Sequence, residues 1–192
     1  TDETKAAIAA ADVVIVVTGT TSSYSAEDRD RASIVLPNNQ EDLIFAVGEL
    51  NPNTVAVMET CGPMRVHPFQ DNVKAILWSS FGGQWKNGFG DIMAGYCPSG
   101  KTTDTWYQTV DTSANSDIPG ITDYEMFPAD GKNGRTYMYY NGANKPSYPF
   151  GYGLSYTTFE YSNLRVDKTS YDANETEDRK SGSAGMPRPI SY

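Results

Sequence analysis

Three short, mainly apolar runs recur in the first half of the chain, separated by polar loops and by segments of helical character. The runs cover residues 13–17, 54–58 and 73–78. The first is an uninterrupted run of β-branched residues, which is typical of a parallel strand buried on both faces, and the other two are interpreted as a second and a third buried strand. Because strand, loop and helix alternate along the chain, the pattern predicts an α/β fold with a mainly parallel sheet.

The segments between the runs have helical character. An alanine-rich segment over residues 1–11 carries acidic residues in its first turn, where they complement the helix dipole. A second helix is expected over 36–50, since proline is tolerated in a first turn, and a short third one over 91–95. The expected buried stripe of the second helix consists of Leu43, Ile44 and Val47. Ligands of parallel sheets bind in loops at the carboxyl ends of strands, so the loop over 18–33 is the first place to look for chemistry.

Aromatic residues dominate the part of the chain that follows Gly100. Their densest group is Tyr148–Phe159, which also contains a proline and two glycines and predicts a tightly packed corner followed by a β-rich segment over 154–161. The apolar content then collapses. We therefore expect one domain over residues 1–166 and a polar linker or tail over 167–192.

Composition narrows the classes of function. The 192 residues carry a net charge of −9 without a basic stripe, which argues against a nucleic-acid partner, and no apolar run is long enough to predict a membrane span. His67 is the only histidine, so a metal site or a catalytic triad would lack partners, and a structural loop histidine is the preferred interpretation. The loop over 18–23 lacks the lysine of a phosphate-binding loop. Cys61 and Cys97 are expected to be free thiols rather than a bridge.

Seven short motifs occur in a fixed order over roughly residues 8–166. They are Ala11-Asp12-Val13-Val14-Ile15-Val16-Val17; Glu27 with Asp30-Arg31; Leu36-Pro37-Asn38-Asn39-Gln40; Gly82-Gly83-Gln84; Pro98-Ser99-Gly100-Lys101; Gly134-Arg135-Thr136-Tyr137; and the aromatic group Tyr148–Phe159. Together they resemble the C-terminal domain of glycoside hydrolase family 3, the β-glucosidase and β-xylosidase family. The resemblance implies a three-layer α/β/α sandwich.

The resemblance also implies a retaining enzyme with two carboxyl groups. The family places an Asp nucleophile on a (β/α)₈ barrel and a general acid/base Glu on a loop of the sandwich domain; here Glu27 matches the acid/base position. Asp30 and Arg31 are expected to pair with the scaffold and support that loop. Without the resemblance, a charged loop would be interpreted as merely solvated. Trp85 is a candidate sugar-stacking residue, although a buried tryptophan that packs a helix start is equally consistent with the sequence.

Departures from the family pattern occur at Cys97, at Thr102-Thr103 and at Asp28, which put local loop shape in doubt rather than the fold. The barrel and the first strand or two of the sandwich are also missing, so we expect a fragment, a cleavage product or one half of a split or permuted enzyme, inactive by itself. The expected substrates are β-linked glucosides or xylosides from plant-derived oligosaccharides, with no metal or other cofactor.

Two other functions stay open. One is a non-catalytic sugar-binding or interdomain scaffold module of the same fold, and the other is an unrelated nucleotide-binding α/β domain. A secreted or periplasmic location is expected, with a cytoplasmic one as the alternative.

Overall fold

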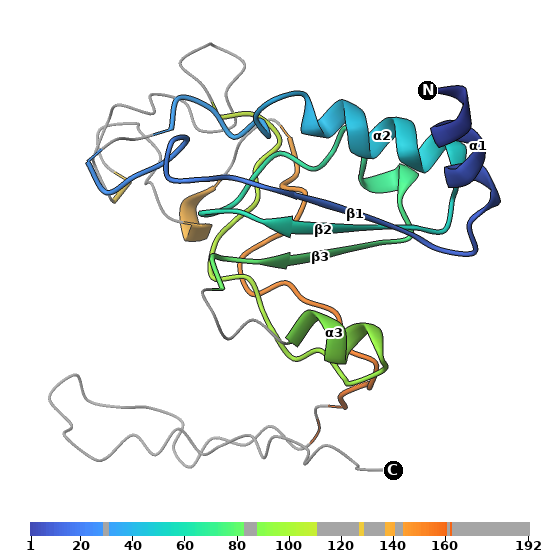
Figure 1. Ribbon diagram of the computed structural model, residues 1–192. Coiled ribbons are helices and arrows are strands. Elements are labelled where there is room, and N and C mark those ends of the chain that lie inside the picture. The colour runs from blue at the N-terminus through green and yellow to red at the C-terminus, as the bar shows by residue number, and fades with distance from the viewer. Residues whose placement is uncertain are drawn as a thin grey trace, which may run out of the picture.

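The computed structural model describes residues 1–28, 31–82, 88–110, 127–128, 137–140, 144–160 and 162 (Figure 1). Helices and strands alternate along its first half, as the apolar pattern predicts. The elements are α1 (Asp2–Ala10), β1 (Val14–Gly19), α2 (Gln40–Leu50), β2 (Thr54–Glu59), η1 (Gln70–Asn72), β3 (Ala75–Ser79), α3 (Gly88–Met93) and η3 (Tyr137–Tyr139). No helix within the described ranges is long and apolar enough to cross a bilayer.

The three strands form one parallel sheet in the order β1-β2-β3. Val16 of β1 lies opposite Ala56 of β2, which in turn lies opposite Ile76 of β3. Figure 1 shows α1 and α2 together above the strands, with α3 beyond β3. The predicted α/β class with a mainly parallel sheet is confirmed.

The helix α2 covers one face of this sheet. Its Ile44 and Val47 are buried against Val16, Ala56 and Met58 of the strands. The core continues into the loops that follow the strands, through Leu36, Met64, Val66, Phe69 and Trp106. Burial of this dry, contiguous cluster is the main source of stability for the sheet.

The predicted start and buried stripe of α2 need correction. The helix begins at Gln40 rather than at Leu36, because Asn38 and Asn39 both adopt a φ of 58° and cannot continue a right-handed helix. Leu43 is 52% exposed, since the buried stripe is Glu41, Ile44, Val47 and Gly48. Leu43 flanks that stripe instead of belonging to it.

The prediction that the first strand is buried on both faces is wrong for β1. Val16 and Thr18 are buried, whereas Ile15 and Val17 are 52% and 65% exposed. Side chains alternate between the two faces of a strand, so Ile15 and Val17 point away from the face that α2 covers. Val57, at the centre of the same second face, is buried. The edge position of β1 therefore accounts for the difference.

The aromatic group Tyr148–Phe159 contributes less regular structure than predicted. No strand forms over 154–160, and position 161 lies outside the described residues; the described part forms an antiparallel bridge between Trp106 and Tyr148, and backbone hydrogen bonds join Thr102 to Gly151 and Tyr152. Trp106 is 1% exposed and meets Trp78 and Tyr148 edge-on, at ring-centroid distances of 5.2 and 6.0 Å. The remaining large side chains of the group are substantially exposed; they are Phe150, Tyr152, Leu154, Tyr156 and Phe159. The packed corner is therefore centred on Tyr148, whose ring also stacks on that of Tyr152 with a centroid distance of 4.7 Å. The predicted tail over 167–192 also lies outside the described residues.

Candidate active site

Glu27 lies on the loop between β1 and α2, at the carboxyl end of the parallel sheet. Its side chain is exposed, and within the described part of the chain no hydrogen bond or ion pair joins its carboxylate. A carboxylate placed in this way is available to a ligand or to a neighbouring domain. Asp30 and Trp85, the other two predicted site residues besides Arg31, lie outside the described residues.

The beginning of this loop is fixed by the ends of the strands and helix around it. The amide side chain of Gln40 binds both backbone groups of Gly19, accepting from its N–H at 2.7 Å and donating to its carbonyl at 3.0 Å. The N–H of Thr20 donates to the carbonyl of Glu59 at 3.0 Å, and its hydroxyl accepts from the N–H of Cys61 at the same distance. A Cβ on Gly19 would lie 2.5 Å from the Glu59 carbonyl oxygen, so glycine is required by this close approach. The first loop residues are therefore held rigidly against β2.

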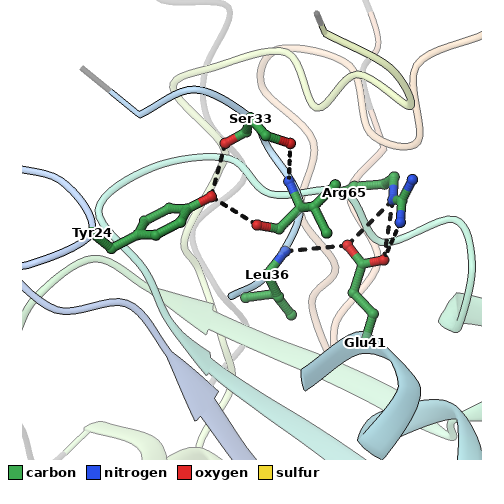
Figure 2. A network of polar contacts seen from close by, with 6 residues as sticks. Tyr24, Ser33, Leu36, Glu41 and Arg65 are labelled. Carbon is green, nitrogen blue, oxygen red and sulfur yellow. Dashed lines mark hydrogen bonds and ion pairs between the residues drawn. The ribbon is translucent and has the colours of Figure 1, made fainter. Parts of the chain in front are cut away.

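Tyr24 precedes Glu27 in the chain and joins its limb of the loop to the limb that contains Ser33, which Figure 2 shows beside the Tyr24 hydroxyl. Its hydroxyl lies 2.9 Å from the carbonyl oxygen of Ser33 and 2.8 Å from that of Val35, and it donates its proton to this pair. The Ser33 hydroxyl in turn accepts from the N–H of Val35 at 3.1 Å. Burial raises the pKa of Tyr24, an effect that the positive charge of Arg31 partly opposes. The phenol is thus kept in the protonated form that donates to the carbonyls.

Glu41 and Arg65 fix the far end of the loop (Figure 2). The Glu41 side chain is 7% exposed and accepts from the Leu36 N–H at 3.2 Å, while the Arg65 guanidinium donates to both of its oxygens. The backbone N–H of Arg65 also donates to the carbonyl of Ile34 at 2.7 Å. A buried carboxylate with this many donors is fully committed to structure.

Arg31 connects the loop to the segment that follows β2. Its Nη1 donates to the carbonyl of Pro63 at 2.8 Å and lies 3.0 Å from the sulfur of Met64 and 3.9 Å from that of Cys61. Burial by itself would raise the pKa of the Cys61 thiol, but hydrogen bonds from Ser25 and Thr20 and the charge of Arg31 outweigh it and lower that pKa. Support of the Glu27 loop by Arg31 stays a prediction.

The two cysteines and the single histidine are the remaining polar candidates for a functional site. Cys61 and Cys97 are free, and the pKa of the exposed Cys97 thiol is lowered, first of all by a hydrogen bond with Ser155. His67 is half-buried in the loop after β2. Within the described ranges, no group of three or more potential ligand residues could hold a metal ion.

A hollow of about 510 Å³ opens beside Arg31. Its lining residues are Arg31, Ile34, Pro63, Thr103, Asp104, Thr105, Tyr107, Val110, Tyr137 and Phe150. The rings of Tyr137 and Phe150 stack with centroids 4.2 Å apart and planes within 6° of parallel. Apolar walls with a few charged groups are typical of sites for small polar ligands.

No local sequence pattern points to the residues that hold the loop. Tyr24 lies in an ordinary polar stretch, and Glu41 carries only the general signal of an acidic residue in a first helical turn. Arg65 follows a Gly-Pro turn without any local motif. Tyr24 binds residues 9 and 11 positions away, and Arg65 binds Glu41 24 positions away, so no local motif marks these contacts.

Comparison with known proteins identifies similar sequences and structures over most of the chain. The family model described as the glycosyl hydrolase family 3 C-terminal domain matches residues 1–156. A thermostable β-glucosidase B from Acetivibrio thermocellus is 37% identical over 179 residues, covering 90% of this chain and 23% of that protein. An exo-1,4-β-xylosidase from Emericella nidulans is 33% identical, with coverage of 89% and 21%. The crystal structure of a family 3 β-glucosidase from Bifidobacterium adolescentis superposes with a TM-score of 0.71 at 30% identity, covering 88% of this chain and 25% of that one. The chain thus spans about a fifth to a quarter of the length of the relatives it matches.

Proposed function

Because this chain belongs to glycoside hydrolase family 3, whose C-terminal domain it matches, we propose that it supplies the general acid/base of a retaining β-glycosidase, with Glu27 as that residue. The observation that carries the proposal is the contrast between exposure and anchoring. Glu27 is an exposed carboxylate at the carboxyl end of a parallel sheet, on a loop whose two limbs are held by Tyr24, Arg65 and Glu41. Anchored limbs with an exposed carboxylate between them suit a group that must meet a substrate from outside the domain.

The chemistry requires a second carboxylate. In the first step, protonated Glu27 gives its proton to the glycosidic oxygen while a nucleophilic Asp of a (β/α)₈ barrel attacks the anomeric carbon and forms the glycosyl-enzyme. In the second step, ionised Glu27 accepts a proton from water as the water attacks the same carbon and releases the Asp. The two carboxyl groups would stand about 5 to 5.5 Å apart. Since the nucleophile lies outside this chain, we expect the isolated chain to be inactive.

The substrates proposed for the whole enzyme are terminal β-linked glucosides or xylosides of plant-derived oligosaccharides. The names of relatives support both sugars, since they include β-glucosidases and β-xylosidases of bacteria, fungi and plants. The chemistry proposed for Glu27 needs no metal or other cofactor. We propose a secreted or periplasmic location for the enzyme, with a cytoplasmic one as the alternative.

A non-catalytic sugar-binding or scaffold module of the same fold is the second candidate. The hollow beside Arg31 favours it, because the exposed, stacked rings of Tyr137 and Phe150 offer apolar faces of the kind that pack against the C–H surfaces of a pyranose. In such a module Glu27 would contribute nothing to turnover. The two candidates therefore differ at a single carboxylate.

The test compares the full-length parent enzyme with its Glu27→Gln variant on p-nitrophenyl β-glucoside and β-xyloside. We expect kcat to fall about 10²- to 10⁴-fold, the usual contribution of a general acid/base. Azide should restore turnover in Glu27→Ala, because a small anion in the vacated space can attack the glycosyl-enzyme without a general base. Asp28→Asn, which removes the neighbouring exposed charge, is the matched control and should leave kcat nearly unchanged. Undiminished turnover of Glu27→Gln would overturn the assignment and favour the binding module.

A further inference from the structure

The hydroxyl of Tyr24 closes the loop that carries Glu27. Tyr24 precedes Glu27 in the chain, while the two carbonyls that it reaches, those of Ser33 and Val35, follow it (Figure 2). One side chain therefore bridges the incoming and outgoing limbs directly. A bridge at the base of a loop removes many of the conformations that its residues would otherwise sample.

The ring of Tyr24 makes this bridge stiff. It is partly buried and packs against the hydrophobic core, so its hydroxyl has a fixed position relative to the sheet. Aromatic side chains have only two side-chain torsions to restrict, and packing of the ring fixes both. Because the ring is held by the core, the hydroxyl holds the loop carbonyls at a fixed position relative to the sheet.

The outgoing limb is itself held along several consecutive residues. The Ser33 hydroxyl accepts from the Val35 N–H, the Ile34 carbonyl accepts from the Arg65 N–H, and the Leu36 N–H donates to Glu41. Tyr24 therefore attaches the residues just before Glu27 to a limb whose backbone is already fixed.

We propose that Tyr24 is a positioning residue for Glu27, through the hydrogen bonds of its hydroxyl to the Ser33 and Val35 carbonyls. The inference rests on the proposed function of Glu27 as acid/base. Tyr24 takes no part in the chemistry, because its proton is donated to backbone carbonyls. Its contribution is to hold the Glu27 carboxyl where a glycosidic oxygen can receive its proton, and small displacements are costly for proton transfer.

The test uses leaving groups that differ in their need for protonation. A 2,4-dinitrophenyl β-glycoside departs without a proton, whereas the sugar released from a β-linked disaccharide must be protonated. In the full-length parent enzyme, we expect Tyr24→Phe to lower kcat/KM for the disaccharide about tenfold and to leave kcat/KM for the dinitrophenyl glycoside within about twofold. Equal losses on both substrates, or no loss on the disaccharide, would overturn the inference.

Control variants distinguish the positioning role of Tyr24 from the acid/base role of Glu27 on which it rests. Tyr148→Phe deletes the hydroxyl of another partly buried tyrosine, whose ring packs edge-on against Trp106, and should change neither value selectively. Ser33→Ala removes the Ser33–Val35 hydrogen bond and should give a smaller loss with the same selectivity, which keeps the test decisive if Tyr24→Phe folds poorly. If Glu27→Gln itself lacks the leaving-group selectivity, the acid/base assignment fails; if only Tyr24→Phe lacks it, the assignment stands and the positioning role is wrong.

Discussion

Two glutamates near the carboxyl end of the sheet have opposite environments. Glu41, in the first turn of α2, is buried and accepts hydrogen bonds from Leu36 and Arg65. Glu27, on the loop between β1 and α2, is exposed, and no described residue pairs with its carboxylate. The same side chain thus serves as a structural anchor in one place and is left available for chemistry in the other.

The difference between Glu41 and Glu27 shows which of the two carboxylates contributes to the stability of this region. Removing the Glu41 carboxylate would leave the Arg65 guanidinium and the Leu36 N–H without their acceptor, which would lower the free energy of unfolding. Removing the carboxylate of Glu27 would cost the folded domain almost nothing. Stability and activity should therefore be separable by substitution at these two positions.

The largest effect is expected on activity at Glu27. Beyond the loss of turnover described above, the Glu27→Gln variant of the parent enzyme should keep the wild-type free energy of unfolding to within about 0.5 kcal/mol, as is usual for exposed positions. Urea denaturation followed by circular dichroism measures this. A large loss of stability would show that Glu27 is a structural residue like Glu41, and the contrast would disappear.

The next largest effect is expected on stability at Glu41. Glu41→Ala should lower the free energy of unfolding by about 2–4 kcal/mol, because it leaves a partly buried guanidinium and a backbone N–H unpaired. The same denaturation experiment checks it, with Asp42→Ala as a matched control at the exposed neighbouring position. Comparable losses for both variants would show that the Arg65 pair contributes nothing special.

A backbone contact at the start of the loop provides a third comparison. Gly19→Ala should cost about 1–3 kcal/mol, since its Cβ would meet the Glu59 carbonyl oxygen, a backbone atom that cannot move aside easily. Gly100→Ala is the control, as nothing lies within 4 Å of a Cβ at that position. Equal thermal midpoints for the two variants would contradict the claim that β2 fixes the loop start.

The smallest expected effect is a pH dependence at the loop base. Burial raises the pKa of Tyr24 above its ordinary value of 10.0, so above that pH the unfolded chain releases the phenol proton while the folded chain retains it. The stabilisation is fully present below pH 10.0 and declines as the pH rises through the folded pKa. Denaturation between about pH 9 and pH 11 should show a smaller decline for Tyr24→Phe than for the wild type. Identical pH profiles would show that the hydroxyl is not protected by folding.

The amino-acid sequence by itself determined the local elements and the family. The apolar runs located β1, β2 and β3, and the ordered motifs pointed to glycoside hydrolase family 3 and to Glu27 as a candidate. Periodicity succeeded because strand and helix formation depend on residues that are close in the chain. It was less accurate at boundaries, where Asn38 and Asn39 delay the start of α2.

Only the tertiary structure decided which side chains are paired and which faces are covered. Val17 and Val57 lie opposite each other on the same face of the sheet and both belong to apolar runs, yet Val17 is 65% exposed and Val57 is buried, because β1 lies at the sheet edge and β2 at its centre. Glu41 is committed to Arg65, a residue 24 positions away in sequence, and Tyr24 reaches across the loop to Ser33 and Val35. Such partners meet only when parallel strands bring their carboxyl-terminal loops to one edge of the sheet, which is a property of the assembled fold and not of any local pattern.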